Sequence, residues 1–156
     1  MQLPLANRLA IRLLIALALF GALSAFVGAA VAILANGAGI PLEYLANSPF
    51  RSYAVPGLIL GLVIGGTQLA AATALLRSQR PALLLSTVAG FEMLIWIFVE
   101  LAVIRQYSWL QAAYFTLGGL ELCLVLALLG IAPTVFHPLH WPDEKHSHAP
   151  YVHGQG

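Results

Sequence analysis

Four long runs of apolar residues, separated by short polar breaks, dominate the pattern of the chain. The runs lie near residues 11–34, 56–76, 82–104 and 112–132. Each can cross the apolar core of a bilayer, which takes roughly 20 helical residues. Because lipid offers the backbone no hydrogen-bonding partners, we expect each run to form an α-helix. The pattern therefore predicts an all-α membrane protein with four transmembrane helices in an antiparallel bundle.

The breaks between the runs carry residues that end or begin helices. Gly37 and Pro41 follow the first run, and Pro56 with Gly57 opens the second, where proline is tolerated in the first helical turn. Within the longest break, residues 41–46 form either one or two helical turns on the membrane surface or an ordinary solvated loop. The pattern leaves both alternatives open.

Composition agrees with a protein that has lipid around it. Of the 156 residues, 60% are hydrophobic and 8% are charged, and the mean hydropathy is +0.88. Soluble domains carry about 25% charged residues. The net charge of +1 provides no basic surface for nucleic acid, so we expect the bilayer as a partner and no nucleic acid.

The basic residues predict an orientation for the bundle. Arg8 and Arg12 precede the first run as in a signal peptide, but that run exceeds the usual h-region of about 7–15 residues, so we interpret it as a retained signal anchor. Cytoplasmic loops carry the excess of Lys and Arg. Both termini are therefore expected in the cytoplasm, on the side of Arg8, Arg12, Arg77, Arg80 and Lys145 and opposite Arg51 and Arg105.

Small residues on the second run indicate a close helix contact. Gly57, Gly61 and Gly65 recur at four-residue spacing and share one helix face, where a neighbouring backbone can approach. This face either packs within the bundle or binds a subunit of another membrane protein.

Four polar residues fall near the middle of the predicted helices: Ser24, Gln68, Glu92 and Glu121. A charged side chain at the bilayer centre costs at least about 2.5–3.5 kcal/mol. Because two carboxyl groups in a dry interior do not both stay ionised at low cost, at least one is expected to be protonated at neutral pH. We predict one polar layer across the bundle. It is a set of interhelical hydrogen bonds, a proton- or cation-binding site, or a contact with a partner helix or cofactor.

Two further residues share a face of the third helix with Glu92. Trp96 and Glu100 follow it at four-residue spacing, and Glu100 is expected near the outer interface. They form a second, outer group of candidate site residues.

Residues 133–156 form a polar tail rich in histidine and proline, expected on the cytoplasmic side. Its imidazoles are candidate ligands for zinc, copper or nickel, although their spacing matches no strong zinc pattern. No histidine lies inside a predicted span to hold haem, and we expect no cofactor. The candidate ligands are His137, His140, His146, His148 and His153.

No residues combine into a catalytic constellation. Cys123 lies in an apolar run with no histidine beside it, and Glu121, two residues away, lies on another helix face. The sequence therefore favours a non-enzymatic protein, and a membrane enzyme with its site at the outer loops ranks last among the functional hypotheses.

A series of short motifs resembles one group of proteins. The motifs are, in order, Ser48-Pro49-Phe50, Tyr53, Pro56-Gly57, Gly90 with Trp96, Trp109-Leu110-Gln111 and Tyr114-Phe115. Over about residues 10–130 the chain resembles a widespread, uncharacterised group of small bacterial four-helix integral membrane proteins. The resemblance implies the fold and a bacterial inner (cytoplasmic) membrane, and it implies no activity. That group has a glutamine at the position of Glu100, which makes a carboxylate there optional.

Two functional hypotheses follow. The first is a non-enzymatic structural or accessory subunit of a bacterial inner-membrane complex, which binds other subunits through the Gly57–Gly65 face. The alternative is a small transporter, or a bundle that binds a ligand or proton through Ser24, Gln68, Glu92 and Glu121.

Overall fold

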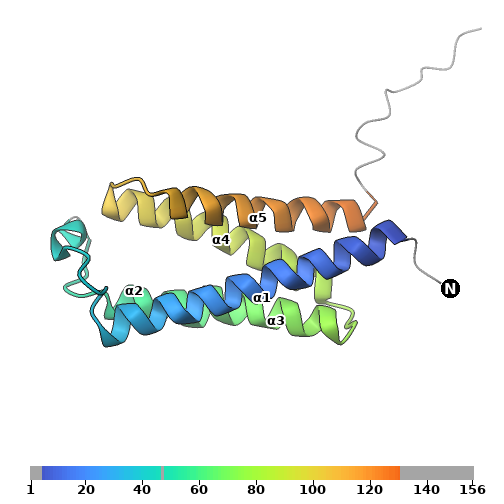
Figure 1. Cartoon of the computed structure of the whole chain (residues 1–156), viewed down its shortest axis with the longest axis horizontal. Coiled ribbons are helices and arrows are strands. Elements are labelled where there is room, and N and C mark those ends of the chain that lie inside the picture. Colours follow the sequence, from blue (N-terminus) through green and yellow to red (C-terminus); the bar gives the residue numbers. More distant parts are fainter. Residues whose placement is uncertain (1–4, 47, 131–156) are drawn as a thin grey trace, which may run out of the picture.

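The computed structural model describes residues 5–46 and 48–130, and it confirms the predicted fold class: all-α, with four long helices packed antiparallel (Figure 1). Each is long and apolar enough to cross a membrane. The first is α1 and the second is built from three segments, α2, η2 and α3, followed by α4 and α5. Their bounds are Leu5–Leu34 for α1, Ala54–Ile59 for α2, Leu60–Gly65 for η2, Gly66–Leu76 for α3, Ala82–Ile104 for α4 and Trp109–Leu128 for α5.

The four spans pack in the order in which they follow one another along the chain. α1 contacts α2, η2 and α3 on one side and α5 on the other, while α4 contacts α3 and α5. Figure 1 shows the pair of α4 and α5 above the pair of α1 and α2–α3. The two pairs lie close together where α1 begins and diverge where α1 ends.

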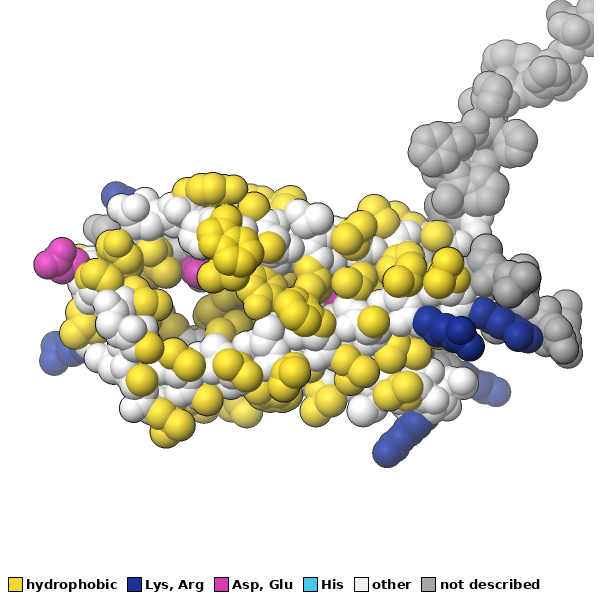
Figure 2. Space-filling view, viewed as in Figure 1, with side chains coloured by type: hydrophobic (Ala, Val, Ile, Leu, Met, Phe, Trp, Pro, Cys, Tyr) yellow, Lys and Arg dark blue, Asp and Glu magenta, His cyan; other side chains and the backbone are white. Residues whose placement is uncertain are grey.

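The two ends of the bundle differ in charge and in covering. One end, here called the arginine end, carries the exposed side chains of Arg8, Arg12, Arg77 and Arg80. The other, called the loop end, consists of residues 35–53 and the turn between α4 and α5. The lateral surface between them is covered mainly by hydrophobic side chains (Figure 2). This pattern is typical of a protein whose sides contact lipid.

Glycines allow α1 to approach the second span closely. All three glycines of the predicted face contact α1, so packing within the bundle is the alternative that the structure shows. A Cβ atom would lie 2.6 Å from Ala32 Cβ if placed on Gly57, 2.9 Å from Ala29 Cβ on Gly61 and 2.9 Å from Phe26 Cε1 on Gly65.

The sequence pattern predicts one uniform α-helix for the second span, but the structure does not have one. Its middle, Leu60–Gly65, is a π-helical turn, in which the backbone N–H of Gly66 bonds to the carbonyl of Gly61. Glycine costs about 1 kcal/mol in an α-helix relative to alanine, which weakens the preference for regular α-helix here. The hydroxyl of Thr67 also lies 2.8 Å from the Val63 carbonyl oxygen and 3.1 Å from that of Ile64. π-turns occur frequently at functional sites.

The fourth span begins and ends earlier than its apolar run. Ser108 caps α5: its hydroxyl accepts from the backbone N–H of Leu110 at 3.1 Å, and Gln111 Oε1 accepts from the backbone N–H of Ser108 at 2.9 Å. This capping box places Trp109 as the first residue of α5. At the other terminus α5 ends at Leu128, before Gly130, whose φ is +71°.

Candidate functional site

A cavity of about 570 Å³ lies inside the loop end of the bundle, between α1, α2–η2, α4 and α5. Its volume is within the range of about 300–1,000 Å³ found for small-molecule sites. Most of its lining is apolar. Figure 2 shows the hollow opening sideways between α1 and the α4–α5 pair. The polar side chains at its wall come from Ser24, Tyr53, Glu100, Gln111 and Tyr114.

The size of the side chains that face inward explains why the loop end is hollow. At the arginine end, Leu14 is fully buried and packs with Leu75 and Val125. At the loop end α1 presents Ala25 and Gly28 to the cavity. These small residues suit the close contact of α1 with α2 but do not reach across the bundle to α4. The space that remains is the cavity.

The loop between α1 and α2 covers the open end of the cavity. Tyr53 anchors it, because its backbone N–H donates to Asn36 Oδ1 at 3.0 Å and its hydroxyl donates to the carbonyl of Pro41 at 2.9 Å. Burial raises the pKa of the Tyr53 phenol, which keeps the hydroxyl protonated and able to donate. Gly37 has a φ of +86°, and a Cβ there would lie 2.8 Å from the Tyr53 ring.

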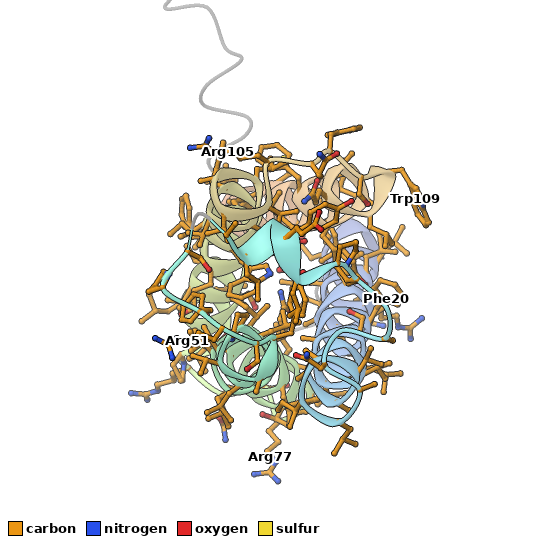
Figure 3. The ribbon with its side chains drawn as sticks, turned by 90° about the vertical axis from the view of Figure 1, so that its left-hand side faces the viewer. Phe20, Arg51, Arg77, Arg105 and Trp109 are labelled. Atoms are coloured by element: carbon orange, nitrogen blue, oxygen red, sulfur yellow. The ribbon has the colours of Figure 1, made fainter. Side chains whose placement is uncertain are left out.

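Within this loop, Leu42–Leu45 forms a 3-10 helix, η1, so residues 41–46 do contain a helical turn. Viewed from the loop end, η1 crosses the middle of the bundle, while the side chains of Arg51 and Arg105 point outward (Figure 3). η1 contacts α4. Leu45 is buried and lines the cavity.

The outer group predicted from the sequence lies on the cavity wall. Glu100 and Trp96 both line it. Gln111 donates from Nε2 to Glu100 Oε1 at 3.4 Å, while its Oε1 caps α5. Gln111 therefore links the start of α5 to the carboxylate in the cavity. Sequence reasoning missed this residue, although the Ser108-X-X-Gln111 spacing is the signature of a capping box.

Two members of the predicted polar layer meet in the interior. Gln68 on α3 donates from Nε2 to Glu121 Oε2 on α5 at 2.9 Å, and their side chains are 0% and 1% exposed. The other oxygen of each group, Gln68 Oε1 and Glu121 Oε1, is buried and has no hydrogen-bond partner. Buried polar groups in proteins are nearly always paired, so we expect Glu121 to be protonated, which gives this contact a second donor.

The other two members do not join this pair. Glu92 is half-buried and accepts from the Thr67 hydroxyl at 2.6 Å, beside a small groove lined by Ile59, Val63 and Trp96. Ser24 lines the cavity and donates to the Gly21 carbonyl of its own helix at 3.0 Å. The four residues therefore occupy three different surroundings.

Between residues 5 and 130, the described part of the chain contains no group of three or more His, Cys, Asp or Glu that could hold a metal ion. His137, His140, His146, His148 and His153 lie outside the described residues. Cys123 is exposed on α5.

Comparison with protein-family models, curated proteins and solved structures found no match. The fold and the apolar helices define a small multi-pass membrane protein with four spans and bilayer contact. The resemblance to the bacterial four-helix group gains no support from these comparisons.

Proposed function

We propose that this protein binds a lipophilic small molecule in the cavity at the loop end, which it takes up from the surrounding bilayer. The observation that carries the proposal is the cavity itself: about 570 Å³, largely apolar, with a few polar groups on its wall. Ligand sites in helix bundles combine an apolar lining with a small number of placed polar groups. The sideways opening in Figure 2 supports entry from lipid.

The wall chemistry favours a molecule with an extended apolar part and one polar end. Phe50, Tyr53, Trp96 and Tyr114 contribute aromatic surface, and Glu100 contributes a carboxylate. Aromatic side chains provide large contact areas for an apolar ligand. This proposal corresponds to the second hypothesis drawn from the sequence, a bundle that binds a ligand. It differs in placing the ligand in the cavity rather than at all four residues of the polar layer.

Filling the cavity should weaken binding. Ser24→Phe places an aromatic ring in the cavity, whereas Ala30→Phe adds the same ring to an exposed position of α1. The substitutions Trp109→Phe and Trp141→Phe leave Trp96 as the single tryptophan. In this background, bromododecanol added to nanodiscs should quench the fluorescence of Trp96 in the parent and in Ala30→Phe. Ser24→Phe should lower the apparent affinity for bromododecanol, measured from the saturable quenching, by about tenfold, because the added ring occupies the space of the ligand. Equal quenching in both variants would contradict the proposal.

The second candidate function is an accessory subunit of a bacterial inner-membrane complex. The long helices and short turns support it, but Gly57, Gly61 and Gly65 contact α1, so a partner must use another face. Recovery at native expression only within a large complex, together with unaltered quenching in Ser24→Phe, would favour this function.

We infer that the arginine end faces the cytoplasm of a bacterial inner membrane, so both termini are cytoplasmic. The support is the placement of Arg8, Arg12, Arg77 and Arg80 at that end, against Arg51 and Arg105 at the other. In a Cys123→Ala background, a membrane-impermeant maleimide added to spheroplasts should label Gln106→Cys and leave Gln79→Cys unlabelled. The reverse pattern would invert the orientation.

A further inference from the structure

Glu92 lies near the middle of α4, on the wall of the small groove between α4 and the second span. Among the described residues that line this groove, Glu92 is the one acidic or basic side chain. Four of the lining side chains are exposed on the outside of the bundle: Ile59, Val63, Ile95 and Val99. Because the lateral surface contacts lipid, the groove opens to the bilayer. Glu92 is therefore a carboxyl group that faces lipid near the middle of its span.

The hydroxyl of Thr67 is surrounded by more oxygen atoms than its proton can serve. Its oxygen lies 2.8 Å from the Val63 carbonyl oxygen, 3.1 Å from that of Ile64 and 2.6 Å from Glu92 Oε2. A hydroxyl has one proton to donate and two lone pairs that accept, and an ionised carboxylate only accepts. With an ionised Glu92, Thr67 would donate either to the carboxylate or to the backbone. In both cases, oxygen atoms with no proton between them would remain at hydrogen-bond distance.

A proton on Glu92 removes this conflict. Glu92 Oε2 then donates to the Thr67 oxygen, and the Thr67 hydroxyl donates to the carbonyl of Val63. The 2.6 Å separation of Glu92 Oε2 and Thr67 Oγ1 lies within the range of about 2.5–3.0 Å for O–H···O hydrogen bonds. It leaves no room for a metal ion between the two oxygens, because Mg²⁺ or Ca²⁺ already needs about 2.0–2.6 Å to each ligand.

The surroundings of Glu92 also favour its uncharged form. The second span, residues 54–76, contains no titratable side chain, and no Lys or Arg is among the described residues that line the groove. The other carboxyl groups of the spans lie elsewhere: Glu100 lines the cavity, and Glu121 bonds Gln68 in the interior. A charged side chain without a partner is unfavourable at this depth in a membrane. The proton thus provides the neutralisation that a basic side chain would otherwise provide.

We propose that Glu92, Thr67 and the π-turn form a proton-binding site that is open to lipid. The ligand is a proton held between Glu92 Oε2 and Thr67 Oγ1, and the Val63 carbonyl accepts the next hydrogen bond of the chain. Release of the proton would turn the Thr67 hydroxyl toward the carboxylate and away from Val63. This inference is independent of the proposed function, because neither Glu92 nor Thr67 lines the cavity.

Infrared difference spectroscopy tests whether Glu92 carries the proton. The carbonyl stretch of a protonated carboxyl group is separate from the bands of carboxylates and amides, and nanodiscs of ether-linked lipids lack ester carbonyls. The spectrum of the parent minus that of Glu92→Gln at neutral pH should contain an acid band, which moves to lower wavenumber in ²H₂O. Thr67→Val should move this band to higher wavenumber, because the acceptor is lost, and Thr67→Ser, the matched control, should leave it in place.

Three results would contradict the proton-binding site. A difference spectrum with carboxylate bands alone would show that Glu92 is ionised. An acid band that stays in place in Thr67→Val would show that Thr67 does not hold the proton. A band that does not move in ²H₂O would show that the proton does not exchange.

Access from lipid is tested in the unaltered protein with dicyclohexylcarbodiimide, which dissolves in the bilayer. The O–H of a protonated carboxyl group adds across one C=N bond of this reagent, and the product rearranges to a stable N-acylurea that peptide mass spectrometry locates. At neutral pH we expect label on Glu92, and none on Glu43, which is exposed in η1, or on Glu121, which is 1% exposed. A water-soluble carbodiimide should leave Glu92 unlabelled. An unlabelled Glu92, or equal labelling of Glu43 by the lipid-soluble reagent, would overturn a site that faces lipid.

Discussion

Gly57→Ala is expected to destabilise the bundle more than any other single methyl addition at its glycines. The new Cβ would lie 2.6 Å from Ala32 Cβ and 3.2 Å from the Ala29 carbonyl oxygen. Neither neighbour is the end of a flexible side chain, so the backbones of α1 and α2 must move apart. Overpacking of this kind typically costs about 1–3 kcal/mol. We expect a loss of about 2 kcal/mol in the free energy of unfolding, measured by titration with SDS in mixed micelles.

Gly66→Ala is the matched control for this substitution. Gly66 begins α3 in the same span, and a Cβ there would meet no atom within 4 Å. Alanine is the better helix former by about 0.5–1 kcal/mol, so this variant should be as stable as the parent or slightly more stable. If both variants unfolded at the same SDS fraction, close packing of Gly57 against α1 would not be what holds these helices together.

Removal of Gln68 alone is expected to cost more stability than removal of the whole polar pair. Gln68→Leu deletes the donor to Glu121, which leaves a carboxyl group that is 1% exposed with no partner. Leaving a buried polar group unsatisfied costs about 1–3 kcal/mol, whereas replacing both partners with apolar groups of similar shape is nearly neutral. We expect a loss of about 2 kcal/mol for Gln68→Leu and recovery to within about 1 kcal/mol of the parent in Gln68→Leu/Glu121→Leu.

Glu121→Gln completes this comparison with a conservative change. A protonated Glu121 and a glutamine at this position both offer Gln68 one donor and one acceptor. We therefore expect the free energy of unfolding to change by less than about 1 kcal/mol. A Glu121→Gln protein that unfolds more easily than the parent would show that the carboxyl group itself supports the fold.

The four helices could be predicted because lipid imposes a length and an apolar composition on each span. The exact start of α5 and the π-turn in the second span depend on factors other than this length and composition. The start of α5 is set by Ser108 and Gln111, whose capping box lies before the apolar run rather than within it. The glycines around Leu60–Gly65 weaken the preference for a regular α-helix, but they do not specify that a π-turn replaces it.

The candidate site could be predicted only in part, because sequence position gives the depth of a residue in the membrane but not the direction it faces. Gln68 and Glu121 lie at one depth and do meet. Glu92 was assigned to the same layer, yet its neighbour Met93 is the buried residue that faces the cavity, and Glu92 faces Thr67. The side chains of successive helical residues point in directions about 100° apart. A shift of one position therefore decides whether a residue faces the core or the groove. The cavity depends on the divergence of the two helix pairs, which no local pattern encodes.

The sideways opening of the cavity has a consequence for how its occupancy is set. For a molecule that enters from lipid, occupancy of the cavity depends on its mole fraction in one leaflet and not on its concentration in water. Each buried methylene contributes about 0.8 kcal/mol to membrane partitioning, so a dodecyl chain is already strongly enriched there. A pocket of this kind needs only modest intrinsic affinity to be filled, and it releases its ligand readily when the leaflet composition changes. Occupancy would then report on the amphiphile content of the bilayer.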